Sequence, residues 1–189
     1  MDAFAGRVYK LRPVSQTRKA AKMPLYFAYG SNMDVAGMAE RCPRARPLGV
    51  ARLARHRLAV MREGWLTAVR DSRGEVHGVL WEASFADMQA LDRYEGLADG
   101  HYAKVVQPVI SERGAKQAII YFGANSGPGV ARADYIAGVL AAARNWNLPA
   151  ATITQLEKFA AAAGVAVAAA PAETSTRVRP LFNTPFDRR

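Results

Sequence analysis

The sequence predicts an α+β fold with a largely antiparallel sheet. Two pairs of strand-like segments are each joined by a short turn, as in antiparallel hairpins: residues 65–70 with 75–83, and residues 101–111 with 115–123. Helical segments stand between and after these pairs and do not alternate with every strand, which is unlike a doubly wound parallel sheet. The 189 residues are enough for one domain with a sizeable core.

The first predicted strand is followed by the most informative turn of the chain. The apolar, aromatic run Leu25–Tyr29 is typical of a buried strand. Gly30, Ser31 and Asn32 then favour a tight turn whose backbone N–H groups converge on one point, and a short helix is expected over residues 34–41. A strand, a polar turn and a helix N-terminus together form a suitable seat for a small anion.

The next elements are predicted to be strands. Residues 49–61 alternate apolar and basic side chains, which indicates one long or bulged strand. The composition of residues 71–74, Asp-Ser-Arg-Gly, favours a hairpin turn between the segments 65–70 and 75–83.

Residues 84–95 form the best-marked helix in the sequence. Ser84 and Asp87 have the spacing of a capping box at its start, and Gly96 stands where a left-handed glycine ends a helix. Apolar residues recur every three positions along it, at Phe85, Met88, Leu91 and Tyr94.

The remaining predicted elements are a hairpin, a loop and two helices. The hairpin turns at residues 112–114, and the glycine-rich residues 123–129 form a loop. Two closing helices are expected over residues 135–146 and 149–163.

The net charge of +10 lies mainly at the two ends of the chain. Residues 1–22 have six basic side chains and one acidic, a net charge of +5, and residues 164–189 carry +2, which leaves +3 for the middle. Residues 1–22 lack apolar periodicity and are expected to be a basic, disordered extension. Residues 164–189, which contain many Ala, Pro and Arg, are expected to be a C-terminal tail.

Side chains suited to metal or disulfide chemistry are sparse. Cys42 is the single cysteine, so no internal disulfide forms, and His56, His77 and His101 are scattered without metal-ligand spacing. We therefore expect no metal and no cofactor, and a cytoplasmic location fits this cysteine usage. No apolar run reaches the length that spans a bilayer, so a membrane is not an expected partner.

Two motifs, in a fixed order, carry a resemblance to a known family. The segment YFAYGSNM at residues 26–33 is followed by LDRYEG at residues 91–96. Together they resemble the gamma-glutamylcyclotransferase family. The similarity extends over roughly residues 25–159 through three shorter segments, RCP at 41–43, VHGVLW at 76–81 and NLP at 147–149.

The resemblance implies a small closed, mostly antiparallel β-barrel with flanking helices over residues 23–163. It also implies an enzyme that cyclises the γ-glutamyl moiety of γ-glutamyl amino acids or amines to 5-oxoproline and releases the amino acid or amine. The glutathione-specific relatives have no Asn in this turn, so Asn32 points to γ-glutamyl dipeptides or γ-glutamyl amines. The expected partner is this small-molecule substrate, and a homodimer is left open.

Glu95 matches the family's catalytic glutamate, which implies a role as general acid and base. It ends the predicted helix, where the macrodipole is negative, and Asp92 lies three residues earlier on the same face. Both effects raise the pKa of Glu95, as burial would. A carboxyl group tuned toward neutrality accepts a proton and later returns it.

The expected substrate-binding residues lie in the turn and on two later tyrosines. The turn would hold the glutamyl end, with its backbone N–H groups and the Ser31 hydroxyl binding either the α-carboxylate or the developing oxyanion. Tyr102 is expected to donate to a substrate carbonyl. Trp65 and Leu66 replace smaller residues common in the family and would reshape the pocket. The complete substrate-binding set is Tyr29, Gly30, Ser31, Asn32, Tyr102 and Tyr121.

Two other functions compete with the enzyme. A non-catalytic member of the same fold would bind a small amide or acid without using a carboxylate, and the retention of Glu95 argues against it. A basic nucleic-acid-associated protein would use the charged ends. The central part carries only +3 and contains no recognised nucleic-acid motif, which disfavours that interpretation.

Overall fold

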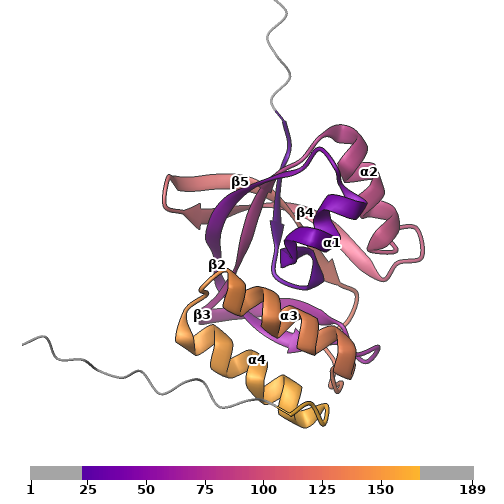
Figure 1. Cartoon of the computed structure of the whole chain (residues 1–189), viewed down its shortest axis with the longest axis vertical. Coiled ribbons are helices and arrows are strands. Elements are labelled where there is room, and N and C mark those ends of the chain that lie inside the picture. The colour runs from indigo at the N-terminus through magenta and orange to yellow at the C-terminus, as the bar shows by residue number, and fades with distance from the viewer. Residues whose placement is uncertain (1–22, 167–189) are drawn as a thin grey trace, which may run out of the picture.

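The computed structural model describes residues 23–166 and shows a closed five-stranded β-barrel flanked by helices (Figure 1). The expected extension at residues 1–22 lies outside the described residues, as do residues 167–189 of the expected tail. The five strands are β1 (Leu25–Ala28), β2 (Arg46–Val60), β3 (Leu66–Glu82), β4 (Tyr102–Ser111) and β5 (Gly114–Gly123).

The strand order confirms the predicted α+β class and the mostly antiparallel barrel. The barrel runs β1-β3-β2-β4-β5, and the β1–β3, β2–β3, β2–β4 and β4–β5 pairs are antiparallel. The barrel closes where β1 lies parallel to β5, with Tyr26 opposite Ile119. Tyr26 and Ala28 share one face of β1 and Phe27 lies on the other, and all three are buried, so both faces of this strand are covered.

The predicted hairpin turn at residues 71–74 is wrong. β3 is one continuous strand, and its pairing with β2 passes directly from Ala54 opposite Glu75 to His56 opposite Arg70. Residues 71–74 therefore bulge out of the ladder opposite Arg55, which has a left-handed φ of 60°. The composition of residues 71–74 is typical of a turn. However, β2 is long enough to pair with β3 on both sides of these residues, in agreement with the long or bulged strand predicted for residues 49–61. The actual β2–β3 turn is at residues 61–65.

The helices begin and end close to the predicted positions. Asp34 caps α1 by accepting a hydrogen bond from the Gly37 N–H at 2.7 Å, and Ser84 with Asp87 forms the capping box of α2. Of the apolar stripe on α2, the middle residues Met88 and Leu91 are buried, whereas Phe85 and Tyr94 are exposed. The helices are η1 (a 3-10 turn, Ser31–Met33), α1 (Val35–Arg41), α2 (Phe85–Tyr94), α3 (Ala133–Asn145) and α4 (Ala150–Ala162).

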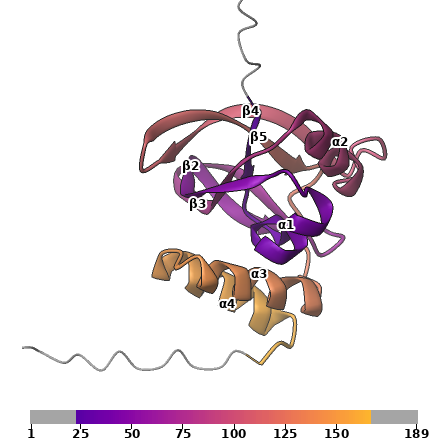
Figure 2. The ribbon, with the colours of Figure 1, turned by 45° about the horizontal axis from the view of Figure 1, so that its top comes forward.

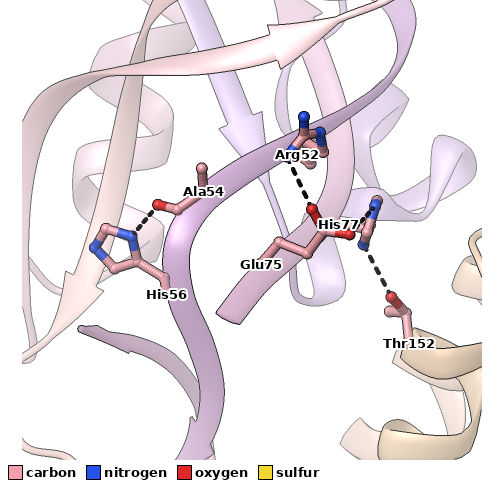
Figure 3. Close-up of polar contacts among 6 residues, drawn as sticks. All are labelled: Arg52, Ala54, His56, Glu75, His77 and Thr152. Atoms are coloured by element: carbon pink, nitrogen blue, oxygen red, sulfur yellow. Dashed lines mark hydrogen bonds and ion pairs between the residues drawn. The ribbon is translucent and has the colours of Figure 1, made fainter. Parts of the chain in front are cut away.

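The α3–α4 pair lies side by side against one end of the barrel, below it in both views (Figures 1 and 2). A polar chain attaches α4 to the barrel. The His77 ring on β3 lies 3.1 Å from the Thr152 hydroxyl on α4, and its other nitrogen lies 3.5 Å from Glu75 (Figure 3). Glu75 in turn accepts a hydrogen bond from Arg52 on β2 at 2.9 Å. This series of polar contacts links β2, β3 and α4.

No helix between residues 23 and 166 has both the length and the apolar character needed to cross a membrane.

Candidate functional site

A cavity of about 490 Å³ lies where the turn after β1 meets the end of α2, and its volume suits a small molecule. Walls also come from the β2–β3 turn and from the start of α3. All of the residues predicted for the site line this cavity: Tyr29, Gly30, Ser31, Asn32, Glu95, Tyr102 and Tyr121. The structure therefore brings together segments that are about 60 to 90 residues apart in the chain.

The turn after β1 is held from two sides. The indole N–H of Trp146, at the end of α3, donates to the Met33 carbonyl at 2.8 Å. Gly30 packs against Tyr135 so closely that a Cβ at this position would lie 2.8 Å from the Tyr135 hydroxyl oxygen. The φ of Gly30 is −125°, which any residue adopts, so contact with Tyr135, and not backbone conformation, is what requires a glycine here.

Glu95 is delivered to the cavity by the end of α2. It is the C-cap residue, and Gly96 follows in the left-handed conformation with φ of 60°. The Gly96 N–H bonds to the Arg93 carbonyl and the Leu97 N–H to the Asp92 carbonyl, which is the Schellman pattern of a helix end. This rigid end fixes the backbone from which the Glu95 carboxyl group enters the cavity.

The pKa of Glu95 is raised from 4.5 to about 7, mainly because burial disfavours the carboxylate. Two neighbours act in the opposite direction and lower the pKa: the positive charge of Arg41 and a hydrogen bond from Asn32. The group is therefore close to half-ionised at neutral pH. Such a carboxyl group is suited both to accept and to return a proton.

Asn32 is buried and holds the Glu95 carboxyl group in place. Its side-chain Nδ2 donates to Glu95 Oε1 at 2.8 Å and to the Tyr26 hydroxyl at 2.9 Å. Its Oδ1 is buried and has no hydrogen-bond partner among residues 23–166. A buried acceptor without a partner is costly, so this oxygen is a candidate contact for a bound ligand.

Asp92 does not have the expected influence on Glu95. Burial raises the Glu95 pKa, and Asp92 is not among its causes. Instead, Asp92 Oδ1 accepts a hydrogen bond from the Tyr121 hydroxyl at 2.6 Å, and the carboxylate pairs with Lys104 at 2.9 Å. Sequence spacing places the two carboxylates on one helix face but does not reveal this neutralising partner on β4.

The hydroxyl groups of the three predicted tyrosines are bonded within the protein. Tyr29 donates to the Tyr121 carbonyl at 2.6 Å, Tyr102 donates to the Leu66 carbonyl at 2.9 Å, and Tyr121 donates to Asp92. The predicted donation from Tyr102 to a substrate would therefore require breaking an existing bond. Burial raises the pKa of these hydroxyls, so the tyrosines form a neutral wall around Glu95.

Sequence reasoning missed several residues of the cavity. Tyr26 and Tyr135 contact Asn32 and Gly30, respectively, and Glu63 and Arg132 line the cavity on its exposed side. The β2–β3 turn was not predicted at its true place, and Arg132 precedes a helix without any motif. Trp65 and Leu66, noted as departures from the family pattern, do line the cavity.

The described residues contain no group of three or more His, Cys, Asp and Glu side chains arranged to hold a metal ion. Cys42 is buried near Asp87, and burial raises the pKa of its thiol to about 11. A thiol with this pKa is inert at neutral pH. Of the two carboxyl groups that line the cavity, Glu63 is exposed, whereas burial raises the pKa of Glu95, so Glu95 is the candidate acid and base.

Known gamma-glutamylcyclotransferases are similar to part of this chain in sequence. Gamma-glutamylcyclotransferases of Bos taurus and Mus musculus are 33% and 35% identical to this chain over 100 and 103 residues. These matches cover 48% and 49% of this chain, and the chain spans about half the length of these relatives, 53% and 54%.

Solved structures extend the similarity to the fold. A structure titled gamma-glutamyl cyclotransferase matches with a TM-score of 0.66 at 26% identity, covering 71% of this chain and 86% of that one. An uncharacterized protein from Homo sapiens matches equally well, with a TM-score of 0.66, 26% identity and coverages of 72% and 87%. The family model described as gamma-glutamyl cyclotransferase, AIG2-like, matches residues 26–147, which include the turn after β1, Glu95 and all five strands except the first residue of β1. The chain therefore belongs to the gamma-glutamyl cyclotransferase, AIG2-like family.

Proposed function

We propose that this protein is a gamma-glutamylcyclotransferase that converts γ-glutamyl amino acids or amines to 5-oxoproline and the free amino acid or amine. The observation that carries the proposal is a carboxyl group with a pKa of about 7 inside a cavity of small-molecule size. This arrangement supports proton transfer at neutral pH. We also propose a cytoplasmic location, where the free thiol of Cys42 stays reduced.

The reaction needs a neutral α-amine on the substrate. Glu95, as the carboxylate, accepts a proton from the α-ammonium group, and the unpaired Oδ1 of Asn32 accepts a second N–H of the same nitrogen. The amine then attacks the γ-carbonyl carbon, which forms the carbon–nitrogen bond of the lactam ring. As the original amide bond breaks, Glu95 returns its proton to the departing nitrogen and then takes the second proton of the former α-amine, which becomes the lactam N–H. That second proton passes to the released amine, which leaves as an ammonium ion. Atoms and protons balance without water or any other reactant.

The turn after β1 supports the glutamyl end of the substrate. Its polar groups are fixed by Tyr135 and Trp146, so little reorganisation is needed when charge develops on the carbonyl oxygen. The Ser31 hydroxyl lies 3.2 Å from the Tyr94 hydroxyl at the same edge of the cavity. Holding a flexible glutamyl chain in its ring-closing shape contributes up to roughly 7–11 kcal/mol in favourable intramolecular reactions.

The experiment is incubation of the full-length protein with a panel of γ-glutamyl dipeptides and γ-glutamyl amines, with 5-oxoproline measured by chromatography. Release of 5-oxoproline by the wild type, and its loss in Glu95→Gln, supports the proposal. A non-catalytic binding protein would instead bind members of the panel without releasing 5-oxoproline.

A further inference from the structure

The exposed side of the cavity holds an arginine that the helix it precedes does not explain. Arg132 is the N-cap residue of α3, and its side chain makes no capping hydrogen bond. Ser, Thr, Asp and Asn are favoured at this position, and a cation is unfavourable at the positive end of a helix. Residues that conflict with local helix preferences, as this N-cap arginine does, are expected at functional or strained sites. Helix capping therefore does not explain the position of the Arg132 guanidinium.

Aromatic stacking and a backbone bond hold Arg132 in place. Its guanidinium carbon lies 4.7 Å from the centre of the Trp65 ring, and its backbone N–H donates to the Gly64 carbonyl at 3.2 Å. Gly64 has a φ of 87°, and a Cβ there would lie 2.6 Å from the Arg132 Cγ. The β2–β3 turn is thus shaped to let this side chain lie across it.

A continuous series of contacts leads from Arg132 to the turn after β1. Trp65 packs edge-on against Tyr135, with ring centres 4.9 Å apart, and the Tyr135 hydroxyl contacts Gly30. Arg132 is exposed, whereas Tyr135 is half-buried. Arg132 therefore lies at the mouth of the same cavity whose inner end contains Glu95 and Asn32.

The guanidinium is not neutralised by its surroundings. No acidic side chain among residues 23–166 forms an ion pair with it. Glu63 lines the same mouth, but both of its carboxylate oxygens accept hydrogen bonds from Asn125, at 3.2 and 2.9 Å. Arg132 consequently presents a planar, positively charged set of donors, which matches a carboxylate.

We infer that Arg132, stacked on Trp65, binds the carboxylate of the departing amino acid and makes the site prefer γ-glutamyl amino acids to γ-glutamyl amines. This inference rests on the proposed function, because it assumes that the glutamyl end lies beside Glu95. The departing group then extends from the γ-carbonyl toward the mouth. In a γ-glutamyl amino acid, the departing group carries a carboxylate one carbon from the scissile nitrogen. In a γ-glutamyl amine that carboxylate is missing.

The test compares γ-glutamylalanine with γ-glutamylethylamine, which differ only in that carboxylate. We expect wild-type kcat/KM to be higher for γ-glutamylalanine by about 10- to 100-fold, the size of hydrogen bonds to a charged group. Arg132→Gln should remove this preference by lowering kcat/KM for γ-glutamylalanine alone. Arg132→Lys, which keeps the charge, should retain part of it. Arg62→Gln is the matched control, because it removes a nearby exposed positive charge that does not line the cavity.

The outcomes separate this inference from the proposed function. If the wild type used both compounds equally well, or if Arg132→Gln slowed both alike, the role of Arg132 would be refuted while the enzyme activity stood. If the wild type released no 5-oxoproline from either compound, the proposed function would fail. Calorimetric binding of the same two compounds to the wild type and to Arg132→Gln would then decide the role of Arg132. Tighter binding of γ-glutamylalanine that Arg132→Gln abolishes supports it, and the lack of such a difference overturns it.

Discussion

Replacing Glu95 by Gln should remove catalysis and, at the same time, make the protein more stable at alkaline pH. The substitution keeps the size of the side chain but prevents proton transfer. Turnover should fall by about 10²–10⁴, the usual contribution of a positioned acid or base. In the wild type, kcat/KM should fall as the pH drops below about 7, because Glu95 becomes protonated and cannot act as a base.

The effect on stability follows from the same pKa. Because the folded-state pKa is raised from 4.5 to about 7, the folded protein binds a proton that the unfolded chain has already lost between these values. The stability that this group contributes is fully present below pH 4.5 and is lost as pH rises through 7. At about 1.4 kcal/mol per pKa unit, the ionised carboxylate destabilises the folded state by about 3 kcal/mol at pH 8.

Urea unfolding at pH 5 and at pH 8 measures this difference. The free energy of unfolding of Glu95→Gln should exceed that of the wild type by about 1 kcal/mol or less at pH 5 and by up to about 3 kcal/mol at pH 8. The gain at pH 8 is reduced by the loss of the hydrogen bond from Asn32 to the charged carboxylate. Glu112→Gln, an exposed carboxylate in the β4–β5 turn, is the matched control and should match the wild type at both pH values. A stability difference that does not change with pH, or turnover within tenfold of the wild type, would refute the reasoning.

Three further predictions follow from single contacts. Gly30→Ala should destabilise the fold by about 1–3 kcal/mol through contact with the Tyr135 hydroxyl, and adding Tyr135→Phe should recover most of this loss in urea unfolding. Asn32→Ala removes a hydrogen bond that lowers the Glu95 pKa, so the acidic limb of the kcat/KM profile should move to higher pH. Burial lowers the His77 pKa below 6.5, so wild-type stability should decrease as pH falls through this value, and His77→Gln should flatten that decrease in thermal melts.

The two segments that form the inner part of the cavity could be predicted because each is a local motif. The strand and turn around Tyr29 and the helix end at Glu95 each have a recognisable pattern, and both have the predicted form. From the sequence, Gly30 is expected to favour a tight turn, whereas in the structure its contact with Tyr135 is what requires a glycine. Its neighbour Tyr135 is brought against it only when the α3–α4 pair packs on the barrel.

The remaining features depend on contacts between distant segments. The neutralisation of Asp92 requires Lys104 and Tyr121, which lie on β4 and β5. The bulge at residues 71–74 depends on the length of β2, because only a partner long enough to pair with both halves of β3 prevents a turn there. Charge and composition within a short window contain no information about such partners.

Barrel closure by β1 has a consequence for the order in which the protein forms during synthesis. β1 is four residues long and lies between β3 and β5, and both of these strands follow it in the chain. The bond from the Tyr29 hydroxyl to the Tyr121 carbonyl spans 92 residues. An emerging chain therefore has β1 without one of its two neighbours until β5 has left the ribosome, and contacts of such long range form late. The lining of the cavity comes from β1 through the start of α3, so a chain made only as far as β5 still lacks Arg132 and Tyr135.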